Sequence, residues 1–79
     1  MYYTYILQSL KYGKLYIGIS DNLRRRVSQH NSGHVKSTAP FTPYQLVWYG
    51  AFETKQKARD FEVYLKSSSG HAFLKKRLV

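Results

Sequence analysis

The sequence predicts an α+β fold, an α/β sandwich in which a small antiparallel sheet is covered by helices. Three short segments are rich in β-branched and aromatic residues, as strands are. Other segments repeat apolar residues every three or four positions, as amphipathic helices do. The resulting order is β-β-α-β-α-α. A hairpin followed by alternating elements favours helices packed against one sheet.

Composition limits the size of the fold and the class of partner. The 79 residues allow one modest core, so we expect a single domain over residues 1–79. Thirteen Lys and Arg against four acids give a net charge of +9, which is typical of nucleic-acid binding, although a basic protein without such a partner remains the alternative. The absence of cysteine excludes disulfides, thiolate zinc sites and cysteine catalysis. We see no leader or membrane span and expect a cytoplasmic protein.

The first two predicted strands, residues 2–8 and 15–20, flank a turn that contains Gly13. Alternation places Tyr3, Tyr5 and Leu7 on one face of the first strand. If the hairpin loop has an even number of residues and no bulge, Tyr5 and Tyr16 emerge on the same face of the sheet.

The first predicted helix carries polar side chains on its apolar face. Ser20 or Asp21 caps it, and Asn31-Ser32-Gly33 ends it. Leu23, Arg26, Val27 and His30 share one helical face, so a guanidinium and an imidazole accompany two core residues. Arg26 suits a phosphate clamp, and the alternative is an arginine that extends over the core to reach solvent.

The second half of the chain predicts a strand and two helices. A polar loop over residues 31–43 precedes the strand at 44–52, whose mostly apolar sequence indicates a more fully buried position. Thr54 caps a helix over 55–66, which Ser67-Ser68-Ser69-Gly70 ends. Residues 71–78 form a short basic closing helix.

Glu62 is the acid best placed to bind a metal ion. It lies at the edge of the apolar face formed by Ala58, Phe61 and Leu65. One carboxylate fits Mg²⁺, which keeps several waters and often binds substrate phosphates. The alternative is a boundary glutamate paired with a neighbouring Lys or Arg.

These positions together resemble the GIY-YIG nuclease superfamily. Tyr16-Ile17-Gly18 is the second half of its signature, and Tyr3-Thr4-Tyr5 occupies the first half, with Tyr5 eleven residues before Tyr16. Arg26, His30 and Glu62 fall at the family's helix positions. The chain is most similar to small stand-alone bacterial members, which are themselves similar to the N-terminal nuclease domain of an excinuclease. The resemblance implies a three-stranded antiparallel sheet flanked by helices.

The resemblance also implies a divalent-metal-dependent endonuclease that hydrolyses DNA phosphodiester bonds in DNA repair, recombination or processing. Glu62 would hold Mg²⁺ or Mn²⁺, and Tyr5 would orient or deprotonate the attacking water and pass its proton toward His30. Tyr16 would bind the phosphate or its water, and Arg26 would neutralise the developing charge. The expected catalytic residues are therefore Tyr5, Tyr16, Arg26, His30 and Glu62. The expected nucleic-acid-binding residues are Arg24, Arg25, Lys36 and Lys66.

The chain departs from the family pattern at two places. Tyr3 stands where the first motif has glycine, and His71-Ala72-Phe73-Leu74 stands where many catalytic members carry an asparagine. Ser69 or His71 could replace that asparagine, or this subgroup does without it. The alternative function is a basic nucleic-acid-binding module that cleaves little. The expected partner is DNA, with RNA, a homodimer and a targeting protein partner left open, and no membrane is expected.

Overall fold

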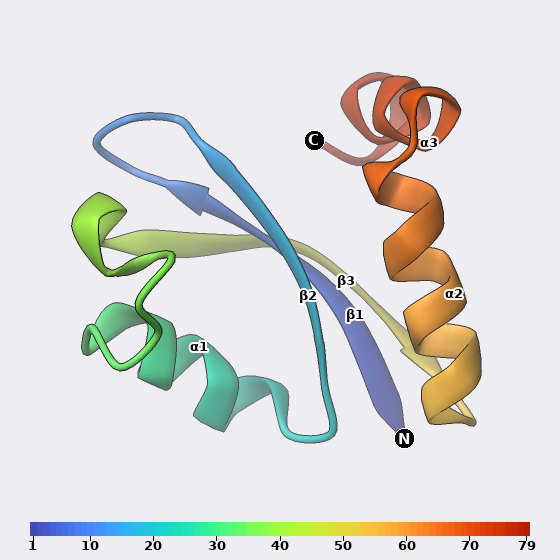
Figure 1. The fold of residues 1–79 in the computed structure, drawn as a ribbon, viewed down its shortest axis with the longest axis horizontal. Coiled ribbons are helices and arrows are strands. Elements are labelled where there is room, and N and C mark those ends of the chain that lie inside the picture. The colour runs from blue at the N-terminus through green and yellow to red at the C-terminus, as the bar shows by residue number, and fades with distance from the viewer.

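A computed structural model describes all residues, 1–79. Its three strands, β1 (Tyr2–Ser9), β2 (Leu15–Ser20) and β3 (Tyr44–Phe52), form an antiparallel sheet in the order β2-β1-β3. Helix α1 (Leu23–Asn31) lies on one face, and α2 (Lys55–Lys66) lies on the other with α3 (Ser68–Phe73) beyond it (Figure 1). A 3₁₀ turn (Ala39–Phe41) precedes β3, and a π-helical turn (Leu74–Leu78) follows α3. The predicted fold class is confirmed.

The central strand is β1, and it is the most buried strand. Four successive side chains, from Thr4 to Leu7, are buried. The prediction of a more fully buried position for residues 44–52 is wrong, because β3 is an edge strand paired only with β1. Its apolar composition has another cause: Trp48 and Phe52 pack their rings on Phe61 of α2, while Tyr49 on the opposite face stays exposed.

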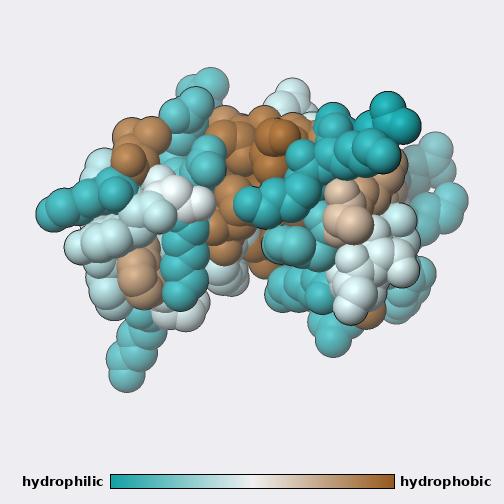
Figure 2. Space-filling view, turned by 90° about the horizontal axis from the view of Figure 1, so that it is seen from above, coloured by the Kyte–Doolittle hydropathy of each residue, from teal (hydrophilic) through white to brown (hydrophobic).

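The sheet divides the core into two layers. On the α2 side the buried residues are Ile6, Ile17, Leu65 and Leu74. On the α1 side Tyr5, Leu7 and Tyr44 pack with the half-buried Leu23 and Val27. The alternation predicted for the first strand therefore holds: Tyr5 and Leu7 point to the α1 layer, and Ile6 points to the α2 layer. Figure 2 shows hydrophilic residues over the two outer lobes and hydrophobic residues gathered between them.

Helix capping places the helix boundaries. Thr54 caps α2 as predicted, since its side chain accepts a hydrogen bond from the Lys57 N–H. The cap of α1 is Asn22 instead of Ser20 or Asp21: its Oδ1 accepts from the Arg25 N–H at 3.0 Å. The Ser20 hydroxyl instead accepts a hydrogen bond from the Asn22 N–H. Ser, Asp and Asn side chains all form such local bonds to the backbone, so the sequence alone did not show which of them caps the helix.

The closing helix begins earlier than predicted. Ser67 ends α2 and at once caps α3, its hydroxyl accepting from the Gly70 N–H at 3.1 Å. Gly70 therefore does not break the chain but lies inside α3, where a Cβ would collide with the Tyr64 carbonyl group. Two helices can meet this closely only at a residue without a side chain.

The long loop is fixed at its base. The Asn31 side chain accepts from the Tyr44 N–H at 2.7 Å and donates to the Tyr44 carbonyl at 3.0 Å. This paired contact fixes the end of α1 against the start of β3. No helix of the fold is both long and apolar enough to cross a membrane.

Candidate active site

Tyr5 is the centre of the candidate site. Its side chain is 1% exposed, and its hydroxyl lies 2.9 Å from Nε2 of His30. Gly18 lies directly opposite on β2, and a Cβ there would stand 2.5 Å from the Tyr5 hydroxyl oxygen. The glycine of the Tyr16-Ile17-Gly18 motif thus leaves the space that the Tyr5 phenol occupies beside β2.

His30 is buried behind Tyr5. Its Nδ1 lies 2.8 Å from the Thr38 hydroxyl, which itself donates to the Val35 carbonyl at 3.3 Å. Because that hydroxyl has one proton, Nδ1–H donates to Thr38 Oγ1 and Nε2 accepts from Tyr5. Burial, reinforced by the Arg26 charge, lowers the pKa of His30 to about 4, so the ring is neutral at pH 7.

His30 shares a helical face with Arg26, as predicted, but it lies inside the core and lines no open cleft. Its ring has no exposed surface, and the helical wheel gave its direction without its depth. Thr38, its other partner, was missed because it lies in an irregular loop with no periodic pattern to indicate that it points inward.

Tyr16 lies on the same face as Tyr5 and His30. Its ring centroid is 4.8 Å from that of His30 and 6.3 Å from that of Tyr5. The predicted shared face of Tyr5 and Tyr16 is therefore confirmed. Unlike His30, Tyr16 is only half-buried, so part of this residue reaches solvent.

Arg26 links the two tyrosines to the surface. Its Nη1 donates to the Gln29 Oε1 at 3.1 Å, which orients the guanidinium. Interaction with the Tyr5 phenol raises the pKa of Arg26. Burial raises the pKa of Tyr5, and the contact with Arg26 opposes that effect without cancelling it. Tyr5 is therefore protonated at neutral pH, and the Arg26 cation lies close enough to act on its hydroxyl.

A basic hollow of about 520 Å³ opens beside Arg26 at the β2 edge. Arg25, Arg26 and Gln29 of α1 line one side, and Lys55 and Arg59 of α2 line the other. Four cations around one hollow suit a phosphate-bearing ligand. Lys55 and Arg59 were not predicted, although their spacing to Glu62 was a usable signal: positions 55, 59 and 62 share one helical face.

Glu62 lies one helical turn beyond Arg59. Its carboxylate is 17% exposed and pairs with Lys66 Nζ at 3.1 Å. The pKa of Tyr5 is raised mainly by burial, then by Tyr16, and to a smaller extent by the negative charge of Glu62. The field of the Glu62 carboxylate therefore reaches the Tyr5 phenol. The chain gathers no group of three His, Cys, Asp or Glu side chains. This donor set fits an ion such as Mg²⁺ that completes its shell with water and phosphate oxygens, and it does not fit zinc.

The remaining predicted residues lie apart from Tyr5. Arg25 borders the basic hollow and pairs with Asp21 at 3.2 Å, whereas Arg24 lines a different groove and Lys36 lies exposed in the long loop. In the stretch His71-Ala72-Phe73-Leu74, where the family's asparagine was expected, Leu74 is fully buried in the core. Ser69 and His71 are both exposed.

The profile described as the GIY-YIG catalytic domain matches residues 1–76. The chain belongs to the GIY-YIG family. A UPF0213 protein of Clostridium perfringens is 40% identical over 67 residues, covering 84% of this chain and 71% of that protein. A UPF0213 protein of Staphylococcus saprophyticus is 36% identical over 75 residues, covering 94% of this chain and 90% of that protein.

A solved structure shows the same GIY-YIG fold. The solution NMR structure of a UPF0213 protein from Bacillus halodurans is 32% identical in sequence and has a TM-score of 0.56. The match covers 96% of this chain and 84% of the Bacillus halodurans chain. Membership places the chain in a nuclease superfamily whose domains act on DNA and generally use divalent metals. The names of these relatives state no activity.

Proposed function

We propose that this chain is a divalent-metal-dependent endonuclease that hydrolyses DNA phosphodiester bonds, acting as one domain over residues 1–79. One observation carries the proposal: the Tyr5 phenol lies between neutral His30, Gly18 and the Arg26 cation, and Arg26 itself lines the basic hollow. A phenol with a proton acceptor on one side and a phosphate-binding cation on the other suits water attack on a phosphodiester.

The metal of this reaction would bind at Glu62. Held there, Mg²⁺ or Mn²⁺ would supply Lewis-acid polarisation of a phosphoryl oxygen and charge stabilisation for the leaving oxygen. In the free chain the Lys66 ammonium forms an ion pair with the Glu62 carboxylate, and it has to move away before a metal ion can bind there. Because exposed ion pairs contribute less than about 1 kcal/mol, this displacement costs little.

The side chains around Tyr5 supply the remaining steps. Arg26 binds the scissile phosphate and neutralises the charge that develops on it, and Tyr16 holds a phosphate oxygen or its water. The Tyr5 oxygen orients the attacking water. As that oxygen takes the proton from water, Tyr5 passes its own proton to Nε2 of His30, which is free to accept it because His30 is neutral.

Cations on both helices would hold the DNA backbone. Arg25, Lys55 and Arg59 surround the hollow next to Arg26. Arg24, Lys36 and Lys66 lie outside the hollow and would bind phosphates further along the strand. Phosphate contacts fix the position of a nucleic acid without reading its sequence, so we expect weak sequence selectivity. We assign this activity to cytoplasmic DNA repair, recombination or processing.

A second candidate is a basic nucleic-acid-binding module with little catalytic activity. The stretch His71-Ala72-Phe73-Leu74 favours it, because it holds no asparagine where many catalytic members carry one. Both candidates predict DNA binding that weakens with salt. Only the endonuclease predicts metal-dependent strand cleavage.

The decisive experiment is a cleavage screen over single-stranded, duplex, flap and branched DNA with Mg²⁺, Mn²⁺ or EDTA. We expect nicking with metal, and a loss of roughly 100-fold or more in Glu62→Gln. The matched control is Asp60→Asn, which removes another carboxylate of α2, one that accepts a hydrogen bond from Gln56 at the surface. Binding without cleavage of any substrate by the wild type would leave the binding module as the function.

A further inference from the structure

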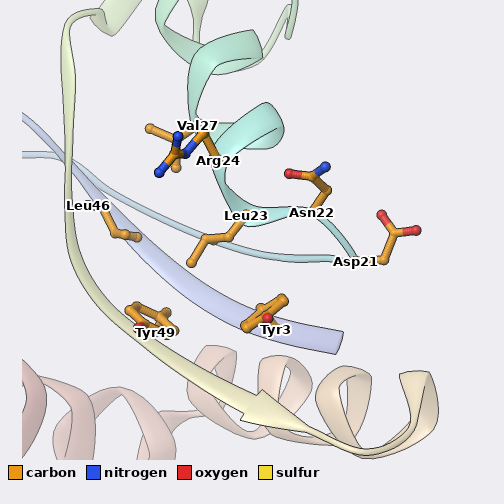
Figure 3. A pocket seen from close by; sticks show the side chains of 8 residues that line it. All are labelled: Tyr3, Asp21, Asn22, Leu23, Arg24, Val27, Leu46 and Tyr49. Atoms are coloured by element: carbon orange, nitrogen blue, oxygen red, sulfur yellow. The ribbon is translucent and has the colours of Figure 1, made fainter. Parts of the chain in front are cut away.

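A second hollow, of about 650 Å³, lies between α1 and the sheet face that carries Tyr3 (Figure 3). Tyr3 of β1 and Tyr49 of β3 lie side by side along its floor, and Leu23, Arg24 and Val27 project from α1 above them. We name this the aromatic groove. It is distinct from the basic hollow, and none of the proposed catalytic residues lines it.

The floor of the aromatic groove presents aromatic surface to solvent. The rings of Tyr3 and Tyr49 meet edge to face, with centroids 6.0 Å apart, and Tyr49 is 53% exposed. Tyr3 stands at the position of the glycine in the family's first motif, so this floor depends on a departure of the chain from that motif. Exposed aromatic rings in a groove are suited to a flat apolar ligand.

The aromatic groove adjoins the basic hollow at the start of α1. Asp21 lines both, and the neighbouring residues Arg24 and Arg25 each line one of them. A strand whose phosphates lie in the basic hollow can therefore turn around the start of α1 and enter the groove. Arg24 stands at the groove to meet a phosphate there.

We propose that the aromatic groove binds an unpaired nucleobase of the DNA substrate, stacked on Tyr49 and Tyr3. This rests on the proposed function and narrows its substrate class to DNA with a single-stranded segment. A base inside a duplex is already stacked and paired, whereas an unpaired base gains the stacking energy on entering the groove. Charge disfavours a second copy as the occupant, because two chains of net charge +9 repel each other.

The test measures binding of labelled oligonucleotides by fluorescence anisotropy in EDTA, so that cleavage plays no part. We expect Tyr49→Ala to weaken binding of a single-stranded oligonucleotide at least about fivefold, and Tyr49→Phe to retain it, since stacking contributes about 1–3 kcal/mol per base. Binding of a blunt duplex should change less than about twofold, because its bases stay stacked on one another. Tyr12→Ala is the control, because Tyr12 is similarly exposed but lies in the β1–β2 turn.

Two results would overturn the proposal. One is an equal effect of Tyr49→Ala on single-stranded and duplex DNA, or no effect on either. The other is a change in self-association of the chain on sedimentation without a change in DNA affinity, which would assign the groove to a second copy. A wild type that never cleaves DNA yet shows the Tyr49 effect would refute the endonuclease and leave base binding intact.

Discussion

Tyr5 is the residue on which the candidate site depends, and only part of its environment was predictable. The spacing of the two tyrosine motifs and strand alternation placed Tyr5 and Tyr16 on one face, which is confirmed. The depth of His30 and its bond to Thr38 were not predictable, because helical periodicity gives a direction and loops carry no periodicity at all.

The close fit of Tyr5 against β2 gives a first prediction. In Gly18→Ala the new Cβ would stand 2.5 Å from the Tyr5 hydroxyl oxygen and 2.7 Å from its ring carbon, so the phenol has to move. We expect cleavage to fall at least about tenfold and stability to fall by about 1–3 kcal/mol. Urea denaturation and the cleavage assay measure these effects. Retention of full activity by Gly18→Ala would contradict the role given to Tyr5.

The buried imidazole predicts how stability depends on pH. The unfolded chain protonates His30 near pH 6.5, whereas the folded chain does so near pH 4 because its pKa is lowered. Between these values the unfolded state binds more protons, so the free energy of unfolding falls as the pH drops, by up to about 3 kcal/mol in total. The stability that comes from keeping His30 neutral is fully present above pH 6.5 and is lost as the pH falls toward 4.

Urea denaturation between pH 7 and pH 4 measures that loss. We expect His30→Gln to be less stable at pH 7 and to lose less stability on acidification than the wild type. His34→Gln serves as the control, since His34 is exposed and contacts Ser32 on the surface. Parallel curves for the wild type and His30→Gln would contradict the assignment.

Among the elements, α2 carries more of the candidate site than its sequence indicated. Its caps and apolar face were predicted correctly because Thr54 and the Ala58–Phe61–Leu65 spacing are local signals. Lys55 and Arg59 were missed, since charged residues on a helix usually belong to a solvated face. The burial of β3 was mispredicted for a related reason: apolar composition does not distinguish a central strand from an edge strand covered by aromatic rings.

The ion pair within α2 predicts a competition for Glu62. Removing the ammonium in Lys66→Met frees the carboxylate, and we expect Mn²⁺ to bind up to about fivefold more tightly, in line with the small contribution of exposed ion pairs. Isothermal titration calorimetry measures the affinity. Lys57→Met, on the same helix and outside this pair, should leave it unchanged. Unchanged Mn²⁺ affinity in Lys66→Met would place the metal elsewhere.

At the scale of the whole molecule, the charge of the chain converges from both helices on the basic hollow at the β2 edge. The excess of cations was readable from composition, but their convergence was not, because α1 and α2 supply them from opposite faces of the sheet. DNA bound there should release counterions in proportion to the phosphates contacted.

Salt dependence tests this convergence. We expect the logarithm of the DNA association constant to fall linearly with the logarithm of salt concentration, and Lys55→Gln and Arg59→Gln each to reduce the slope by about 1. Tyr49→Ala should leave the slope unchanged, since stacking releases no counterions. If Lys55→Gln and Arg59→Gln keep the wild-type salt dependence, DNA does not occupy the basic hollow.

The paired contact between Asn31 and Tyr44 has a consequence for how this fold can change over evolution. Because the two ends of the intervening segment are held together by two hydrogen bonds, residues can be inserted before the buried Thr38 without moving the sheet. Doubling the length of such a closed loop costs only about 0.6 kcal/mol in chain entropy. The exposed stretch around His34 and Lys36 is therefore a place where a descendant of this chain can gain a recognition segment while α1 and β3 keep their positions.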